Sequence, residues 1–303
     1  MVVGQGDVIR QLLPCLAAGG HGLLEGPAGV GKSLLVQSLG VAYGLAFTHV
    51  HLTPDLTPGD LLEGLAAASR AASKEEAPPV RLFANLVLAD EIDRCTPRVQ
   101  SCLLEAMQKQ TITVAGNTWP LPSPFAVVAT QGPSTLEGPH PLSEKQLDHF
   151  LMKLIVHFPS ASDLARIVGR TTGAGRPWPR RIGDAKALSE LVHLVRQVPI
   201  ARHVTDYAVR LVLASRPEHP SAPPLVRQHL TSGASPRGAQ TLVLAAKAAA
   251  LIDGRYNVSF GDVRQVALPS LRHRLIRTED SREAGVDVDV IVKQLLDTIR
   301  EEP

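Results

Sequence analysis

A glycine-rich segment near the start of the chain matches GxxxxGK[ST], the pattern of a phosphate-binding loop. Its residues are Gly26, Pro27, Ala28, Gly29, Val30, Gly31, Lys32 and Ser33. The segment lies between a short apolar run, 21–25, and a helical pattern, 32–43, which is the strand–loop–helix context that such a loop requires. Glycines allow consecutive backbone N–H groups to surround phosphate oxygens, and a helix N-terminus adds about half a positive charge. We therefore expect residues 26–34, ending at Leu34, to bind a nucleotide.

Within this loop, two side chains have expected roles of their own. The ammonium of Lys32 is expected to contact the β- and γ-phosphates, and the hydroxyl of Ser33 to ligate Mg²⁺. The second half of the site is expected from a buried strand, 86–90, that ends in Asp90 and is followed by Glu91. Ligands of parallel sheets bind at the carboxyl ends of the strands. We expect Asp90 to hold Mg²⁺ through water and Glu91 to act as general base on the attacking water.

The apolar pattern divides the chain into two parts. Up to about residue 160, short apolar runs alternate with helical patterns, which indicates a parallel sheet covered by helices. The candidate strands are 21–25, 47–52, 86–90, 125–130 and 151–158. A connector rich in Gly, Pro and Arg, 171–183, is followed by helical patterns without a strand at 184–197, 204–214, 235–253 and 260–275. The predicted fold class is thus α/β, with a nucleotide-binding core over 1–183 and a helical domain over 184–303.

Composition excludes several other classes of protein. With 31 Lys+Arg against 29 Asp+Glu, the net charge of +2 does not fit a basic protein that coats nucleic acid. No apolar stretch approaches the roughly 18–20 residues of a membrane span, and the first residues do not resemble a signal peptide. Three cysteines without CxxC spacing fit a reducing compartment, so a cytoplasmic location is expected.

Several longer segments together resemble the MoxR family of AAA+ ATPases over nearly the whole chain. The most specific is 83–107 (FANLVLADEIDRCTPRVQSCLLEAM), which other AAA+ groups do not usually share. The other matching segments are Val3-Gly4-Gln5, 20–33, 53–58 (TPDLTP), 129–131 (ATQ), 141–150, Ser235-Pro236-Arg237 and 271–275 (LRHRL). The resemblance implies a five-stranded core, a helical lid, ATP with Mg²⁺, and a homo-oligomeric ring, usually a hexamer.

The resemblance also implies an activity and one more site residue. It suggests chaperone-like remodelling of client proteins, often of a partner with a von Willebrand factor A domain. Arg237 corresponds to the sensor-2 arginine, which contacts the γ-phosphate from the lid. Independently of the family, Ser235 and Pro236 predict the start of a long helix, which places Arg237 in its first turn. A cation there opposes the helix dipole by about 0.3–1 kcal/mol, so we expect an anion nearby.

Two positions depart from the family pattern. The family has a sensor-1 Asn where this chain has Gly132, and an arginine finger where it has His149. An arginine finger contributes roughly 10³–10⁵ in turnover, and a neutral histidine cannot replace its forked contact with phosphate. ATP binding should therefore persist while hydrolysis is slow. If its segment is helical, Lys145 lies one turn before His149 on the same face, and we hypothesise that it replaces the finger.

Alternatives to a remodelling ATPase stay open at this stage. One is a nucleotide-binding scaffold or switch with little hydrolysis, and another is one subunit of a heteromeric ring. A helicase or loader acting on DNA is disfavoured by the net charge. His49 and His51 lie on one face of a strand without a third ligand, which favours packed or hydrogen-bonded histidines over zinc. Residues 111–121 predict a β-hairpin, and 70–79 a mobile polar loop.

Overall fold

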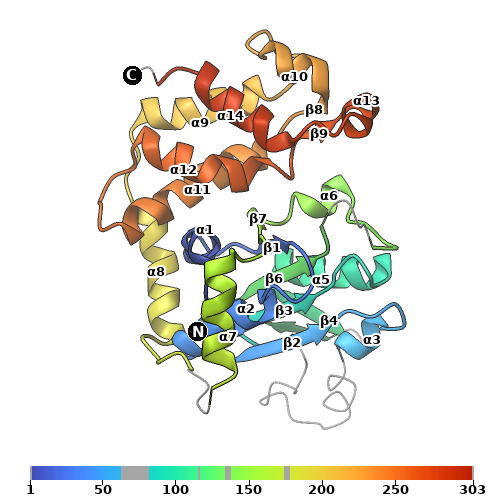
Figure 1. Ribbon diagram of the computed structural model, residues 1–303. Helices are drawn as coiled ribbons and strands as arrows, with labels where there is room; N and C mark the ends of the chain where they lie inside the picture. The colour runs from blue at the N-terminus through green and yellow to red at the C-terminus, as the bar shows by residue number, and fades with distance from the viewer. Residues whose placement is uncertain (1, 63–81, 115–116, 134–137, 174–177, 302–303) are drawn as a thin grey trace. The chain divides into compact units, whose positions relative to one another are not determined.

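The protein is described here by a computed structural model, which covers residues 2–62, 82–114, 117–133, 138–173 and 178–301. The predicted loop at 70–79 lies outside these residues. The chain forms two compact units that are interleaved in sequence (Figure 1). The first comprises 1–10, 19–142 and 154–190, and the second comprises 11–18, 143–153 and 191–303. The last of these boundaries, at 190/191, lies near the predicted division at 183/184.

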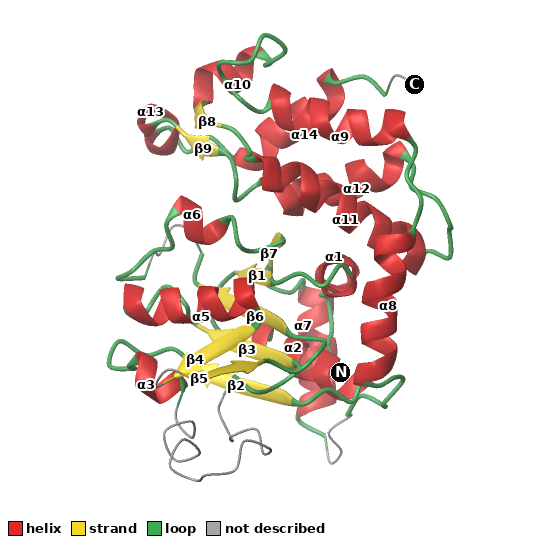
Figure 2. Ribbon diagram, turned by 180° about the vertical axis from the view of Figure 1, so that it is seen from behind, coloured by secondary structure: helices red, strands yellow, loops and turns green. Residues whose placement is uncertain are grey.

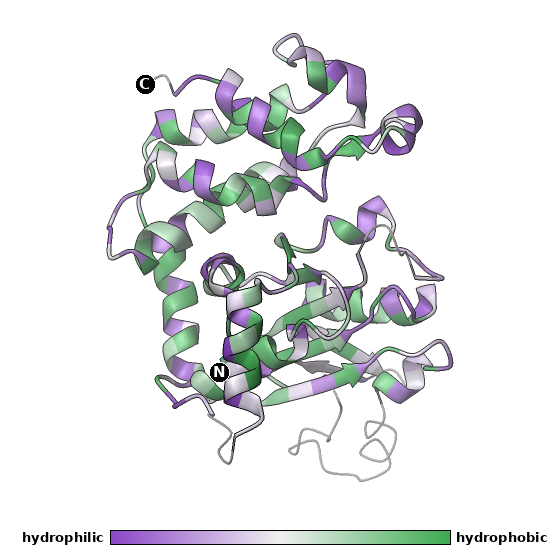
Figure 3. Cartoon of the chain, viewed as in Figure 1, coloured by the Kyte–Doolittle hydropathy of each residue, from purple (hydrophilic) through white to green (hydrophobic). Residues whose placement is uncertain are grey.

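The first unit contains a five-stranded sheet, as predicted. Its order is β2 (Phe47–His51), β3 (Leu86–Asp90), β6 (Ala126–Gln131), β1 (Gly22–Glu25) and β7 (Met152–Ile155), and β7 begins in the second unit. The pairs β2–β3, β3–β6 and β6–β1 are parallel. Strands β1, β3 and β6 are buried almost throughout, and Figure 3 shows the central strands as mainly hydrophobic. Strands buried on both faces have continuous apolar runs, which explains why the pattern located them.

Helices surround this sheet, and their starts follow the sequence signals. They are α2 (Lys32–Ala42), α3 (Pro58–Leu61), α5 (Pro97–Lys109) and α7 (Ala161–Thr171). Helix α1 (Gly6–Ala17) and helix α8 (Ala185–Gln197) each have residues in both units. Thr96 is the N-cap of α5 and Pro97 its first residue, as predicted. The predicted hairpin forms from β4 (Thr111–Val114) and β5 (Asn117–Pro120), which pair antiparallel.

The second unit is mainly helical (Figure 2). Its further helices are α6 (Glu144–Leu147), α9 (Arg202–Ala214), α10 (Pro224–His229), α11 (Pro236–Ile252), α12 (Phe260–Leu271), α13 (Glu279–Glu283) and α14 (Val288–Thr298). The prediction that this part lacks strands was wrong, because β8 (Leu230–Ser232) pairs antiparallel with β9 (Ile276–Arg277). Strands of three and two residues are too short to show an alternating pattern. Of the helices described, none combines the length and apolar character that a bilayer crossing requires.

Candidate nucleotide-binding site

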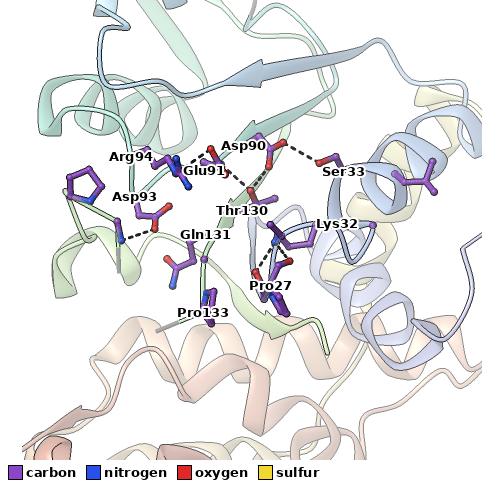
Figure 4. A pocket seen from close by; sticks show the side chains of 18 residues that line it. Pro27, Lys32, Ser33, Asp90, Glu91, Asp93, Arg94, Thr130, Gln131 and Pro133 are labelled. Atoms are coloured by element: carbon purple, nitrogen blue, oxygen red, sulfur yellow. Dashed lines mark hydrogen bonds and ion pairs between the residues drawn. The ribbon is translucent and has the colours of Figure 1, made fainter. Parts of the chain in front are cut away.

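A cavity of about 600 Å³ lies in the first unit where the predicted loop meets the ends of β3 and β6 (Figure 4). The predicted residues that line it are Gly26, Pro27, Ala28, Gly29, Gly31, Lys32, Ser33, Leu34, Asp90 and Glu91. Val30 is the one residue of the loop that is not among its lining residues. The cavity therefore brings together two segments, 26–34 and 90–91, that lie about 60 residues apart in sequence.

The loop owes its shape to three glycines. Gly29 and Gly31 have φ values of 79° and 91°, which side-chain-bearing residues rarely adopt. At Gly26 the constraint is space, because a Cβ there would lie 2.3 Å from the carbonyl oxygen of Val156. Helix α2 follows with Gly31 as N-cap, so no side chain caps its first turn. The unpaired N–H groups of that turn are suited to bind phosphate oxygens.

Lys32 folds back over its own loop. Its Nζ donates to the carbonyl oxygens of Gly26 at 2.7 Å and Pro27 at 2.8 Å. Burial lowers the pKa of Lys32, and the nearby carboxylates of Asp90, Glu91 and Asp93 oppose that decrease. The ammonium is thus held at the cavity wall by neutral carbonyl groups.

Ser33 and Asp90, the two predicted metal ligands, are in contact. Ser33 Oγ lies 3.1 Å from Asp90 Oδ2, and Thr130 on the intervening strand β6 donates to Asp90 Oδ1. His49 Nε2 lies 3.1 Å from Asp90 Oδ2. Burial raises the pKa of Asp90, but the hydrogen bonds from Thr130, His49 and Ser33 outweigh it, and the net shift is downward. A hydroxyl beside a carboxylate that stays ionised is a donor set that fits Mg²⁺.

Glu91 follows directly at the end of the strand in a left-handed conformation, with φ of 60°. Its backbone N–H donates to Thr130 Oγ1 at 2.9 Å. Its carboxylate lies 3.2 Å from Nε of Arg94 and 3.7 Å from Nε2 of His51. A non-glycine residue at positive φ is uncommon outside functional sites. Here the conformation directs Glu91 into the cavity with two basic side chains beside it.

His49 thus lies within hydrogen-bond distance of Asp90, and His51 lies near Glu91. The contact of His49 agrees with the prediction of packed or hydrogen-bonded histidines. Among the described residues no group of three or more His, Cys, Asp or Glu side chains is arranged to hold a metal ion. The roles of Thr130 and Arg94 were not predicted. Thr130 lies near the carboxyl end of β6, which is adjacent to both β1 and β3. Its place at a strand end is the signal that could have identified it as a site residue.

In the second unit, the anion expected near Arg237 is the carboxylate of Asp148. Arg237 lies in the first turn of α11, and its Nη1 is 3.7 Å from Asp148 Oδ2 and 3.4 Å from the carbonyl oxygen of Asp148. Ser235 Oγ also binds Asp148 Oδ2, at 3.0 Å. The carboxylate of Asp148 therefore offsets the unfavourable interaction of Arg237 with the helix dipole.

Three consecutive side chains, 272–274, bind the segment 148–153. Arg274 Nε donates to Asp148 Oδ1 at 2.8 Å, and its other nitrogens contact the carbonyl oxygens of Phe150 and Leu151. His273 Nε2 lies 3.0 Å from the carbonyl oxygen of Phe150, and Arg272 Nη1 lies 3.4 Å from that of Lys153. These contacts explain why 143–153 belongs to the second unit.

The expected geometry of Lys145 is only partly present. Helix α6 has four residues and ends at Leu147, so Lys145 and His149 do not share a regular helix and the one-turn argument was wrong. Asp148 is the C-cap of α6, and its carboxylate is bound by Ser235 and by Arg274. Burial, and then the charge of Arg237, lower the pKa of His149, which keeps its imidazole neutral near pH 7.

Together, a parallel sheet with a phosphate-binding loop after β1, carboxylates after β3 and a separate helical unit define a P-loop ATPase of the AAA+ class. Comparison with known proteins agrees. Residues 21–152 match the ATPase family associated with various cellular activities (AAA), and residues 222–295 match the AAA lid domain.

The relatives narrow this class further. The chain is 36% identical to Chaperone MoxR1 of Mycobacterium tuberculosis, over 99% of this chain and 79% of that protein. It is 28% identical to Protein MoxR of Paracoccus denitrificans, over 94% and 89% of the two chains. The crystal structure of a candidate ATPase from Cytophaga hutchinsonii superposes with a TM-score of 0.88 at 32% identity, covering 99% and 91%. The chain belongs to the MoxR family of AAA+ ATPases.

Proposed function

We propose that the protein binds ATP with Mg²⁺ in the cavity of the first unit, hydrolyses it slowly, and uses the cycle to remodel partner proteins. The observation that carries this proposal is the contact of Ser33 with Asp90, beside Lys32 and Glu91 in one cavity. Its cytoplasmic location is part of the proposal.

Each residue has a proposed part in this reaction. Residues 26–34 hold the phosphates through backbone N–H groups and the Lys32 ammonium. Ser33 and Asp90 hold Mg²⁺, which when bound neutralises charge on the phosphates. Glu91 accepts a proton from the attacking water once it separates from Arg94. Arg237 exchanges the Asp148 carboxylate for the γ-phosphate.

Assembly into a homo-oligomeric ring, hexameric as the family resemblance suggests, is a further part of the proposal. In a ring, Lys145 of one subunit replaces the missing arginine finger at its neighbour's nucleotide. Lys145 is exposed, whereas His149 is half-buried and neutral, which supports Lys145 as the cation of this segment. By family resemblance, the client or partner carries a von Willebrand factor A domain, and neither nucleic acid nor a membrane takes part.

A second candidate function is a switch or scaffold that assembles on binding ATP, or one subunit of a mixed ring. Gly132 and His149 favour it, and so does the engagement of Glu91 by Arg94. The two candidates differ in turnover. We would measure ATP turnover against protein concentration for the wild type, Lys32→Ala and Glu91→Gln, with native mass determination with and without ATP.

Turnover that rises with assembly and disappears in Glu91→Gln supports the ATPase. Tight ATP binding that builds a ring, with turnover equal to that of Glu91→Gln, supports the switch. No binding of ATP by the wild type, or equal binding by Lys32→Ala, contradicts both.

A further inference from the structure

Asp93 is a buried carboxylate in the cavity that the proposed mechanism does not yet use. It is 7% exposed and lines the cavity with Glu91 and Gly132. Its Oδ2 accepts a hydrogen bond from the N–H of Gly138 at 3.1 Å, whereas its Oδ1 has no hydrogen-bond partner among the described residues. Figure 4 shows its side chain between those of Arg94 and Gln131. A buried oxygen without a partner is costly to stability, so its retention calls for a ligand.

The backbone on either side of this carboxylate is held by hydrogen bonds. Gln100, which is 1% exposed, donates from Nε2 to the carbonyl oxygens of Ile92 at 3.0 Å and His140 at 2.8 Å. The N–H of His140 in turn donates to the backbone oxygen of Asp93 at 3.0 Å. Preorganised groups at the reacting centre need no rearrangement during reaction, which is the property expected of a group that orients substrate.

The charge of Asp93 acts on Lys32 in the phosphate-binding loop. Its carboxylate is one of three that oppose the lowering of the Lys32 pKa. The turn that carries Asp93 is bonded to strand β6, which Gly132 directly follows, since Ile92 N–H donates to Thr130 O at 2.9 Å. At Gly132 no side chain can hold a water molecule, and the amide of Gln131 donates to Glu25 at 2.7 Å. Gly132 therefore offers no side-chain acceptor to a water molecule, whereas Oδ1 of Asp93 is an acceptor without a partner among the described residues.

We infer that Asp93 is a further catalytic residue, whose Oδ1 accepts a hydrogen bond from the attacking water and supplies the orientation that Gly132 cannot. This inference rests on the proposed ATP hydrolysis. In that step the water oxygen forms a bond to the γ-phosphorus, and the bond between the γ-phosphorus and the β–γ bridging oxygen breaks. One proton of the water passes to Glu91, the other stays hydrogen-bonded to Asp93, and ADP leaves with the electron pair of the broken bond.

The test compares Asp93→Asn with the wild type. An amide has one acceptor oxygen, which the Gly138 N–H takes, so the other terminal atom, at the position of Oδ1, becomes an NH₂ donor. We expect kcat to fall about 100-fold, while the affinity for a fluorescent ATP analogue and the unfolding midpoint stay unchanged. The matched control is Asp206→Asn, in an exposed pair on α9, which should change none of these quantities.

A second variant separates orientation of water from a structural role. Gly132→Asn places an amide where the family has one, and we expect it to restore turnover in the Asp93→Asn background by at least tenfold. If Glu91→Gln abolishes turnover, hydrolysis itself is established. In that case an unchanged kcat in Asp93→Asn, or the absence of rescue by Gly132→Asn, overturns the role of Asp93. Wild-type turnover equal to that of Glu91→Gln instead overturns hydrolysis itself, and the role of Asp93 with it.

Discussion

Oδ1 of Asp148 lies 2.8 Å from Nε of Arg274, although the two residues are 126 positions apart in sequence. Arg274 is 5% exposed and also donates to Thr241 and to the carbonyl oxygens of Phe150 and Leu151. Burial lowers the pKa of Arg274, and the carboxylate of Asp148 opposes that shift. The second unit therefore contains a buried cation whose acidic partner comes from a segment between two strands of the sheet.

Replacing Asp148 by alanine should destabilise the protein strongly. The buried guanidinium of Arg274 would keep carbonyl partners but lose its counter-charge, and removing one partner of such a pair costs about 3–5 kcal/mol. Urea unfolding followed by circular dichroism measures the loss. Glu218→Ala, in an exposed pair with Arg216, is the control and should change stability by less than about 0.5 kcal/mol. Equal effects of the two variants would refute the importance of the buried pair.

Ser33→Ala should weaken the binding of ATP only when Mg²⁺ is present. The hydroxyl is proposed as a metal ligand, so its removal should lower affinity about tenfold with Mg²⁺, or about 1.4 kcal/mol, and leave it unchanged in EDTA. Titration of a fluorescent ATP analogue in both buffers gives the comparison. Ser38→Ala on the same helix removes a hydroxyl bonded to Leu34 O and serves as the control. A loss of affinity that is equal in both buffers would argue against metal ligation.

His273 should make the stability of the protein depend on pH. Burial, and then the adjacent Arg274, lower its pKa well below 6.5. Below pH 6.5 the unfolded chain therefore binds more protons than the folded chain, and the free energy of unfolding should fall as the pH decreases. The expected slope for this residue is up to about 1.4 kcal/mol per pH unit, and its contribution is complete above pH 6.5.

The variant His273→Gln should flatten that slope between pH 6.5 and 5 in urea unfolding. His193→Gln replaces an exposed histidine of α8 and should leave the slope as it is. If both variants keep the wild-type slope, His273 is not the residue that titrates.

His149→Arg should increase ATP turnover if the missing arginine limits the rate. A finger acts on the nucleotide of another subunit, and the gain should be at least about tenfold and at most the roughly 10³–10⁵ that such a residue contributes. Turnover measured against protein concentration should show the gain only where the protein assembles. His149→Gln should behave as the wild type. A gain that is independent of concentration would contradict an effect across subunits.

Local sequence signals predicted the elements that line the proposed nucleotide-binding cavity. The loop at 26–33 requires glycines for its backbone conformation, and β1, β3 and β6 are short continuous apolar runs. Thr130 and Arg94 were missed because their contacts with Asp90 and Glu91 depend on strand order and on a turn after β3. Strand register of this kind is a property of the folded sheet and is weakly encoded in any one segment.

The interleaving of the two units was missed for a related reason. The segment 143–153 follows β6 and includes the start of β7, so by its position in the sequence it would belong to the core. Its place in the second unit depends on side chains at 272–274 that bind its carbonyl oxygens. Backbone carbonyls are present in every segment and carry no sequence signal.

The contacts of Arg274 also determine how the chain can be dissected. A fragment cut at 183/184 would contain the buried guanidinium of Arg274 but neither the carboxylate of Asp148 nor the carbonyl oxygens of 150 and 151. Such a fragment would have a buried cation without its counter-charge, and the complementary core fragment would contain 143–153 without the side chains that bind its carbonyl oxygens. An exchange of the helical unit between relatives must therefore transfer 11–18 and 143–153 together with 191–303.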